Sequence, residues 1–210
     1  MDMPQMILKS LLLIACAAHI LTWRCDWKLT YLDGGRFDFK YLNDNRKLSE
    51  VFGKTQTGQP LFATLAGVLG LTVAFPGYLA LCEWMRQYSS GYAALMFVGC
   101  ILFFLPGMAH HVFCGVVEWF YIRMGRTEQA RQTILEFFKK TSGIMFACYV
   151  GLLIFSTALF AAVVTGTTSL PNWACIFNIL PLFLALMAFR IPGTGNLVSA
   201  AMTLGLAILI

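Results

Sequence analysis

Charged residues are scarce in this sequence. Asp, Glu, Lys and Arg make up 12% of its 210 residues, whereas hydrophobic residues make up 59%. A soluble domain with this balance would expose far too much apolar surface to water. The composition therefore excludes an ordinary water-soluble globular protein and indicates an integral membrane protein.

The sequence also lacks the short signatures of several common sites. Its seven cysteines form no C-x-x-C pair and lie mostly within apolar runs, so we interpret them as small buried residues rather than a disulfide framework or a redox centre. No H-E-x-x-H metalloprotease signature is present. The net charge of +5 comes from cations mixed with acidic residues in loops, which argues against nucleic acid as a partner.

Long apolar runs are what the sequence has in abundance. Six of them approach the roughly 20 residues that a helix needs to cross a bilayer. We therefore predict an all-α fold, a polytopic transmembrane helical bundle of six helices that forms a single transmembrane domain over residues 1–210. The predicted helices cover residues 5–25, 61–82, 91–119, 143–165, 172–189 and 195–210. No small-residue cleavage site follows the first run, so we expect it to be retained as a helix.

The distribution of Lys and Arg predicts the orientation of these helices. Thirteen of the 15 cationic residues lie in the connections after the first, third and fifth helices, and only Lys9 and Arg86 lie on the opposite side. Loops rich in Lys and Arg resist translocation across the membrane. We therefore expect the connections 26–60 and 120–142 to be cytoplasmic and both termini to lie outside the cytoplasm.

Both long connections contain candidate local structure. The alternating segment 28–42 surrounds a Gly-Gly pair and predicts either a hairpin or a turn that closes a helical extension. Residues 43–55 indicate either a short amphipathic helix on the bilayer, capped at Asn43 or Asp44, or an ordinary surface loop. The segment after Thr127 predicts a capped helix, either interfacial or an extension of the fourth transmembrane helix.

Ionisable side chains occur inside two of the predicted helices. Residues seven apart on an α-helix differ in direction by only about 20° and share a face. His111, Cys114 and Glu118 of the third helix therefore lie along one stripe. In the first helix, His19 and Asp26 are also seven residues apart. If these two helices pack side by side, their histidines and carboxylates come together near the cytoplasmic end.

Such a cluster has a chemical purpose within a membrane. A carboxylate alone in hydrocarbon is costly, whereas a neighbouring histidine shares its charge and titrates near neutrality. The cluster can relay protons, hold a cation or bind the polar head of a lipid or solute. Histidine and carboxylate side chains also ligate zinc and other transition metals. The candidate metal ligands are His110, His111, Glu118 and Asp26.

Simpler interpretations exist for the same residues. Asp26 and Glu118 would also be explained by contact with headgroup water, and His19 by packing against a backbone carbonyl. His110 and His111 are harder to explain in this way. Because they are adjacent on a helix, they cannot both face lipid, and at least one enters the bundle.

Three separated parts of the sequence resemble a known family. They are CDWKLTY after the first helix, PGMAHHVF in the third, and the pair LPNWACIFNILP and GTGNLVSAAM near the end. In this order and spacing they resemble a bacterial family of six-pass membrane proteins catalogued as a domain of unknown function. The resemblance covers nearly the whole chain, implies a location in the bacterial inner membrane, and singles out Asp26, His110 and Asn196. It implies no reaction or substrate, since the family has no established activity.

The sequence leaves three functions open. The working hypothesis is a protein that binds or translocates an ion, a proton or a small solute, and an oligomer is one option if it is a transporter. The second is a membrane enzyme acting on a lipid or isoprenoid head group, with His110 or His111 as acid or base. The third is an accessory subunit without chemistry. The candidate binding residues are His110, His111, Glu118, Asp26, His19, Cys114 and Asn196.

Overall fold

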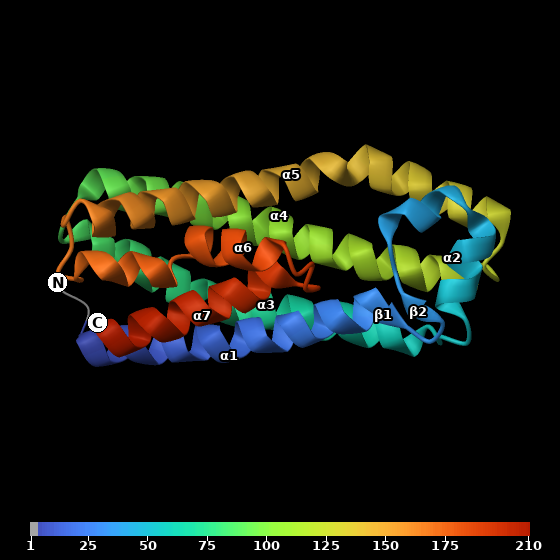
Figure 1. Ribbon diagram of the computed structural model, residues 1–210, viewed down its shortest axis with the longest axis horizontal. Coiled ribbons are helices and arrows are strands. Elements are labelled where there is room, and N and C mark those ends of the chain that lie inside the picture. The colour runs from blue at the N-terminus through green and yellow to red at the C-terminus, as the bar shows by residue number, and fades with distance from the viewer. Residues whose placement is uncertain (1–3) are drawn as a thin grey trace.

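The structure, a computed structural model, describes residues 4–210. Four long helices run along the long axis of the molecule (Figure 1): α1 (Gln5–Thr30), α3 (Gly58–Arg86), α4 (Ser90–Arg123) and α5 (Glu128–Val164). Each of the four is long and apolar enough to cross a membrane. The prediction of an all-α chain is confirmed apart from one two-stranded hairpin, and these helices have the length and composition expected of a membrane protein.

The described part of the chain contains seven α-helices, so the predicted number of helices, six, is wrong. The additional helix covers residues 45–52, and four of the seven are long and apolar enough to cross a membrane. A second difference lies near the C-terminus, where the predicted helix 172–189 is broken. This region and the end of the chain form η2 (Asn172–Phe177), α6 (Ile179–Met187) and α7 (Thr194–Leu209). Asn178 makes the break, because its side-chain oxygen caps α6 at Leu180 N, and its amide donates to the carbonyl of Ser156 on α5. The nine residues of α6 extend about 14 Å, too short to cross a bilayer alone.

The fourth predicted transmembrane helix begins earlier than expected. α5 starts at Glu128 and continues without interruption to Val164. Thr127 caps it as predicted, because its hydroxyl accepts a hydrogen bond from the backbone of Ala130. The segment after Thr127 is therefore an extension of the transmembrane helix and not a separate interfacial helix.

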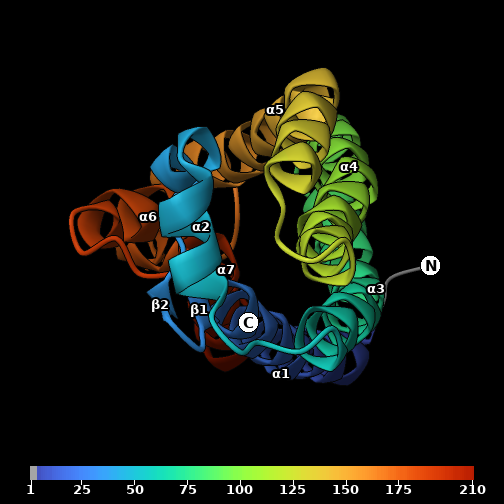
Figure 2. The same ribbon diagram turned by 90° about the vertical axis from the view of Figure 1, so that its right-hand side faces the viewer.

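The helices surround the long axis of the molecule (Figure 2). α3 lies between α1 and α4, α5 follows α4, and the C-terminal elements η2, α6 and α7 complete the circle between α5 and α1. Glycines allow the closest approaches, as is usual between membrane helices. A Cβ atom at Gly151 of α5 would come within 2.3 Å of the backbone of Phe103 on α4, and one at Gly99 of α4 would come within 2.5 Å of the backbone of Phe155 on α5. The side chain of Gln5 donates to the carbonyl of Ile210, so both ends of the described chain lie at one end of the molecule.

Residues 31–57, which we call the cap, cover the opposite end of the molecule (Figure 1). The cap contains β1 (Tyr31–Leu32), β2 (Gly35–Arg36), η1 (Phe39–Asn43) and α2 (Asn45–Phe52). Of the two predicted alternatives at the Gly-Gly pair, the hairpin forms, with β1 antiparallel to β2. Exposed Asp38 caps η1, and the hydrogen bond from the backbone of Lys40 lowers the pKa of its carboxyl.

The amphipathic helix predicted in the cap exists as α2, but its apolar face packs against protein. Asp44 caps it by accepting hydrogen bonds from the backbones of Arg46 and Lys47. Its Leu48 and Phe52 are 0% and 1% exposed. They belong to a cluster that also contains Tyr121 of α4 and Ile134 of α5. The expectation that this helix lies on the bilayer is therefore wrong, because the extensions of α4 and α5 provide the surface that it covers.

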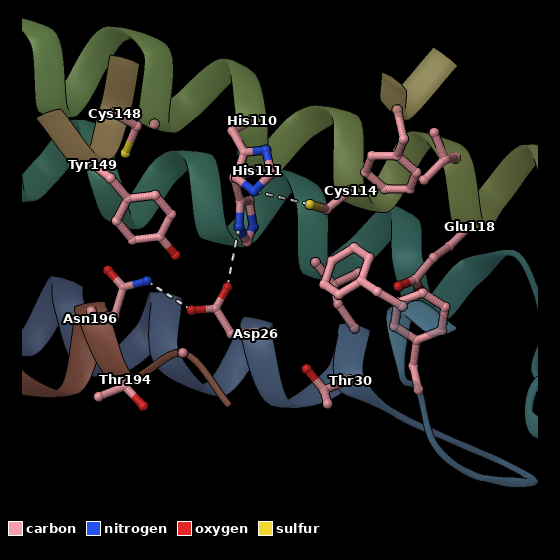
Figure 3. A pocket seen from close by; sticks show the side chains of 18 of the residues that line it. Asp26, Thr30, His110, His111, Cys114, Glu118, Cys148, Tyr149, Thr194 and Asn196 are labelled. Carbon is pink, nitrogen blue, oxygen red and sulfur yellow. Dashed lines mark hydrogen bonds and ion pairs between the residues drawn. The ribbon is translucent and has the colours of Figure 1, made fainter. Parts of the chain in front are cut away.

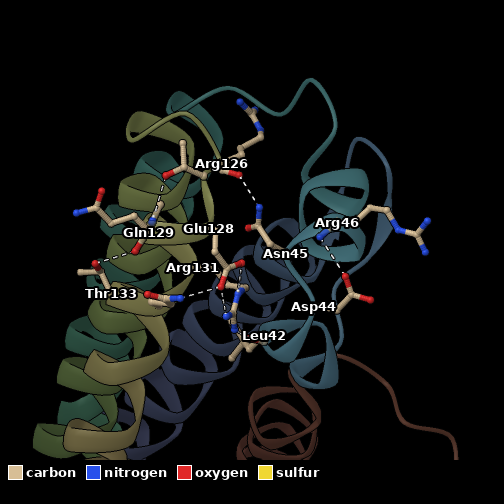
Figure 4. Close-up of polar contacts among 12 residues, drawn as sticks. Leu42, Asp44, Asn45, Arg46, Arg126, Glu128, Gln129, Arg131 and Thr133 are labelled. Carbon is tan, nitrogen blue, oxygen red and sulfur yellow. Dashed lines mark hydrogen bonds and ion pairs between the residues drawn. The ribbon is translucent and has the colours of Figure 1, made fainter.

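Hydrogen bonds to the turn between α4 and α5 hold the cap in place (Figure 4). The side chain of Asn45 donates to the carbonyl of Arg126 and accepts from the hydroxyl of Tyr121. Arg126 has a positive φ of 59°, and its guanidinium donates to the carbonyl of Thr55 at 2.6 Å. The guanidinium of Arg131 donates to the carbonyl of Leu42.

Substituting Asn45 by alanine is expected to loosen the cap. The change removes both hydrogen bonds of the Asn45 side chain and leaves the Tyr121 hydroxyl only its longer contact of 3.3 Å with the carbonyl of Arg126. We therefore expect a loss of about 1 to 3 kcal/mol in the free energy of unfolding. Unfolding in mixed micelles measures this loss, and limited proteolysis should cleave the cap faster. The exposed Asn43→Ala is the matched control. Equal behaviour of the two variants would contradict the proposed anchoring role.

Candidate functional site

A cavity of about 390 Å³ lies inside the molecule, where the long helices meet the cap (Figure 3). Its walls come from α1, α3, α4, α5, α6, α7 and the cap. The polar and ionisable side chains on these walls are Asp26, Thr30, His110, His111, Cys114, Glu118, Cys148, Tyr149, Thr194 and Asn196. Six of the seven predicted binding residues are among them, and the seventh, His19, lies just outside.

Asp26 lies at the centre of a chain of polar contacts. Its Oδ1 is 3.4 Å from Nδ1 of His111, and its Oδ2 accepts a hydrogen bond of 2.8 Å from the amide of Asn196. The Asn196 oxygen is in turn 2.9 Å from Nδ1 of His19. This chain joins α1, α4 and α7, which are distant in sequence. Asn196 can take part because α7 begins at Thr194, directly after a turn at Gly193.

Gly193 permits the close contact between this turn and α1. Its φ of +65° is in the left-handed region, and a Cβ atom there would lie 2.5 Å from Oδ2 of Asp26. Trp23 of α1 holds the same turn, because its indole N–H donates to the carbonyl of Pro192 at 3.0 Å. Gly193 therefore allows a tight turn immediately before α7, and this turn lies against Asp26.

The side chain of His111 extends from α4 across α3 to Asp26 of α1. The sequence-based hypothesis was that the first and third predicted helices pack side by side, but α1 and α4 scarcely touch and α3 lies between them. The imidazole of His111 lies against Gly67 of α3, where a Cβ atom would be 1.9 Å from Nε2. Its Nε2 is 3.1 Å from the carbonyl oxygen of Ala63. Because Gly67 has no side chain, the imidazole of His111 on α4 fits against α3 and contacts Asp26 of α1.

The two ring nitrogens of His111 face different partners. The carbonyl of Ala63 only accepts, so a hydrogen on Nε2 would be donated to it. Nδ1 lies 3.4 Å from Oδ1 of Asp26, so a protonated imidazole would form an ion pair with this carboxylate. His111 therefore connects the backbone of α3 with the carboxylate of α1.

His19 is fully buried next to the cavity. Since the oxygen of Asn196 accepts, Nδ1 of His19 carries the hydrogen, and its Nε2 has no partner among the described residues. The ring packs edge-on against Tyr78 at 5.5 Å and near Phe104. His19 therefore hydrogen-bonds to the side chain of Asn196 and does not line the cavity itself.

The remaining predicted residues lie along α4. The thiol of Cys114 is 3.6 Å from Nε2 of His110, one turn earlier on the same helix. Glu118 lies a further turn toward the cap, apart from Asp26 and His111 (Figure 3). Among residues 4–210, no group of three or more His, Cys, Asp or Glu side chains is placed to hold a metal ion. The geometry gives no support to the metal hypothesis for His110, His111, Glu118 and Asp26.

Several wall residues were not predicted from the sequence. Thr30, Tyr149 and Thr194 add hydroxyl groups, and a group of phenylalanines from the cap, α4, α5 and α6 supplies much of the apolar surface. A threonine or tyrosine in an apolar run carries no distinctive signal. The cap phenylalanines lie in the connection predicted between the first two transmembrane helices, and only the folded chain shows that they reach the cavity.

Comparison with known proteins gives one match. A family model described as "Family of unknown function (DUF6796)" matches residues 3–210. The chain belongs to this family. The predicted membership in a family of unknown function is confirmed, whereas the bacterial source and the six membrane passes stay predictions. No curated protein and no solved structure matches this DUF6796 member.

Proposed function

We propose that this DUF6796 protein binds a small molecule with a largely apolar body and a hydrogen-bonding head in the cavity beneath the cap. The cavity itself carries this proposal. Its volume of about 390 Å³ lies in the range of small-molecule sites, which are mostly apolar with a few convergent polar groups. Asp26, His110 and Asn196 supply such groups on one part of the wall, and aromatic rings supply most of the rest.

Two partly exposed wall residues indicate where the ligand enters. Tyr149 of α5 is 52% exposed and Phe39 of the cap is 60% exposed, yet both line the cavity. Phe39 also contacts Phe138 of α5 edge-on, with ring centroids 6.0 Å apart. The entrance is therefore on the side of the molecule, between α5 and the cap. A molecule dissolved in the bilayer would reach it without passing through water.

The orientation in the membrane is proposed from the sequence. Most Lys and Arg residues lie in the cap and near the turn between α4 and α5, so we propose that this end faces the cytoplasm. If the protein is in a bacterial inner membrane, the cavity then lies near the cytoplasmic surface. A ligand bound there would have its body at the level of the lipid chains.

Filling the cavity is expected to abolish binding. Gly195 lines the cavity, and a Cβ atom there meets nothing within 4 Å, so Gly195→Leu adds a side chain without a backbone clash. The probe is an alkyl alcohol that carries a photoreactive diazirine, added to the protein in lipid nanodiscs. In the wild type, cross-linking to cavity peptides should saturate with probe concentration. In Gly195→Leu, the saturable part should fall at least about tenfold, which corresponds to about 1.4 kcal/mol of lost binding free energy.

Gly143→Leu is the matched control for this experiment. Gly143 is an exposed position on α5, also with nothing within 4 Å of an added Cβ atom, and it does not line the cavity. This variant should keep the saturable cross-linking. If wild-type labelling of the cavity peptides rises linearly with probe, as on a lipid-facing surface, the proposed function is wrong.

A further inference from the structure

Glu118 is a buried carboxylate that the contacts around Asp26 do not use. Its side chain lines the cavity, and the residue is only 7% exposed. Among the described residues, its Oε2 has no hydrogen-bond partner. An acceptor that is removed from water and left unpaired costs free energy, so native structures seldom contain one without a reason. A ligand that donates a hydrogen bond or carries a positive charge would supply the missing partner.

Aromatic rings surround the same end of the cavity. Phe37, Phe39 and Phe52 of the cap and Phe138 of α5 all line it. They form a connected set, in which Phe37 meets both Phe39 and Phe52 edge-on and Phe39 meets Phe138, with centroid separations of 5.3 to 6.4 Å. Aromatic faces attract cations, and rings combined with a carboxylate are a common way to bind alkylated ammonium groups.

The charges of the cavity favour the same class of ligand. Of the described residues that line it, none is Lys or Arg, whereas two are carboxylic acids, Asp26 and Glu118. His111 lies 3.4 Å from Asp26 and balances its charge when protonated, whereas among residues 4–210 no cationic side chain is paired with Glu118. A phosphate or carboxylate head would meet no fixed positive charge there.

We propose that the cavity binds an organic cation, with its alkylated ammonium group between Glu118 and the rings of Phe37, Phe39, Phe52 and Phe138. This inference rests on the proposed function and names the ligand class for the same cavity. The ammonium group neutralises Glu118, and the apolar substituents of the cation occupy the aromatic part of the wall. The ligand enters past Phe39, so this residue contributes both to the entrance and to the cation site.

Competition against the photoreactive alcohol tests the proposal. The two competitors are benzyltrimethylammonium and its uncharged isostere neopentylbenzene, which share shape and differ in one unit of charge. We expect the cation to displace the probe at a concentration at least about tenfold lower than the isostere, as a desolvated cation site would require. Equal potency of the two competitors in the wild type would overturn the cation site. The proposed function would still stand in that case, because the probe itself would have bound saturably.

Two variants separate the charge from the rings. Glu118→Gln keeps the shape of the side chain and removes its charge, so the preference for the cation should fall to about twofold or less while the probe still binds. Phe39→Leu should reduce the preference by about threefold. Glu136→Gln removes an exposed carboxylate on α5 that is paired with Lys140, and should leave the preference unchanged. A full preference in Glu118→Gln would contradict the assignment of Glu118.

Discussion

Replacing Asp26 by alanine is expected to have the largest effect of any single change in the cavity. Asp26 is the common partner of His111 and Asn196, and its side chain is only 19% exposed. Removing one member of a buried charged pair typically costs about 3 to 5 kcal/mol, because the other member stays buried without compensation. We therefore expect a loss of this size in the free energy of unfolding in mixed micelles, together with loss of saturable probe binding.

Asp38→Ala is the control for this prediction. Asp38 is an exposed carboxylate in the cap that pairs with Lys40 and caps η1, and loss of a surface pair and a helix cap costs about 1 to 2 kcal/mol. If Asp26→Ala lowers stability no more than Asp38→Ala, Asp26 is not the centre of the network. A double-mutant cycle of Asp26→Asn with His111→Gln measures their coupling directly. We expect a coupling of about 0.5 to 3 kcal/mol, as for residues in contact.

The helical spacing of ionisable residues was a good guide to the cavity wall. His111, Cys114 and Glu118 share one stripe of α4 in the sequence, and all three line the cavity in the structure. The reason is local, since residues on one face of a helix stay on one face wherever the helix is placed. The spacing within one helix does not predict which helices pack against each other. That pairing depends on close packing between segments far apart in the sequence.

Two differences illustrate what the sequence could not show. The helix predicted over 172–189 is apolar apart from Asn172 and Asn178, but Asn178 bonds to Ser156 on another helix and interrupts it. Similarly, the apolar face of α2 has the periodicity of a helix on a bilayer, but the extended ends of α4 and α5 cover it instead. In both cases local propensity correctly predicted a helix. Tertiary contacts determined where the first helix is interrupted and what covers the apolar face of the second.

The role of Gly67 depends on tertiary packing and could not be predicted from the sequence. Glycine is common in membrane helices, so its presence in α3 carries no specific signal. In the structure, the imidazole of His111 occupies the space that a side chain at position 67 would fill. The contacts of both ring nitrogens of His111 depend on that space, since one faces Ala63 and the other faces Asp26.

The variant Gly67→Ala is therefore expected to destabilise the protein, although the same change at an open helical position is neutral or stabilising by up to about 1 kcal/mol. Its methyl group would lie 1.9 Å from Nε2 of His111, so the ring must move and lose its two partners. Overpacking alone costs about 1 to 3 kcal/mol, and each unpaired buried group adds a similar amount. We expect a total loss of about 3 kcal/mol or more, with reduced probe binding. Gly143→Ala, at an exposed position on α5, gives the baseline for the substitution itself.

A second substitution at His111 distinguishes this steric mechanism from a general effect on α3. In Gly67→Ala/His111→Ala the added methyl group has space, because the imidazole is gone. The double variant should then be no less stable than His111→Ala alone, and the two losses should be strongly non-additive, since the residues are in contact. Additive losses would mean that alanine at position 67 disturbs α3 independently of His111. In that case the path from α1 to α4 would not depend on the gap at Gly67, and Asp26 and His111 would have to be held together by the backbone positions of their own helices.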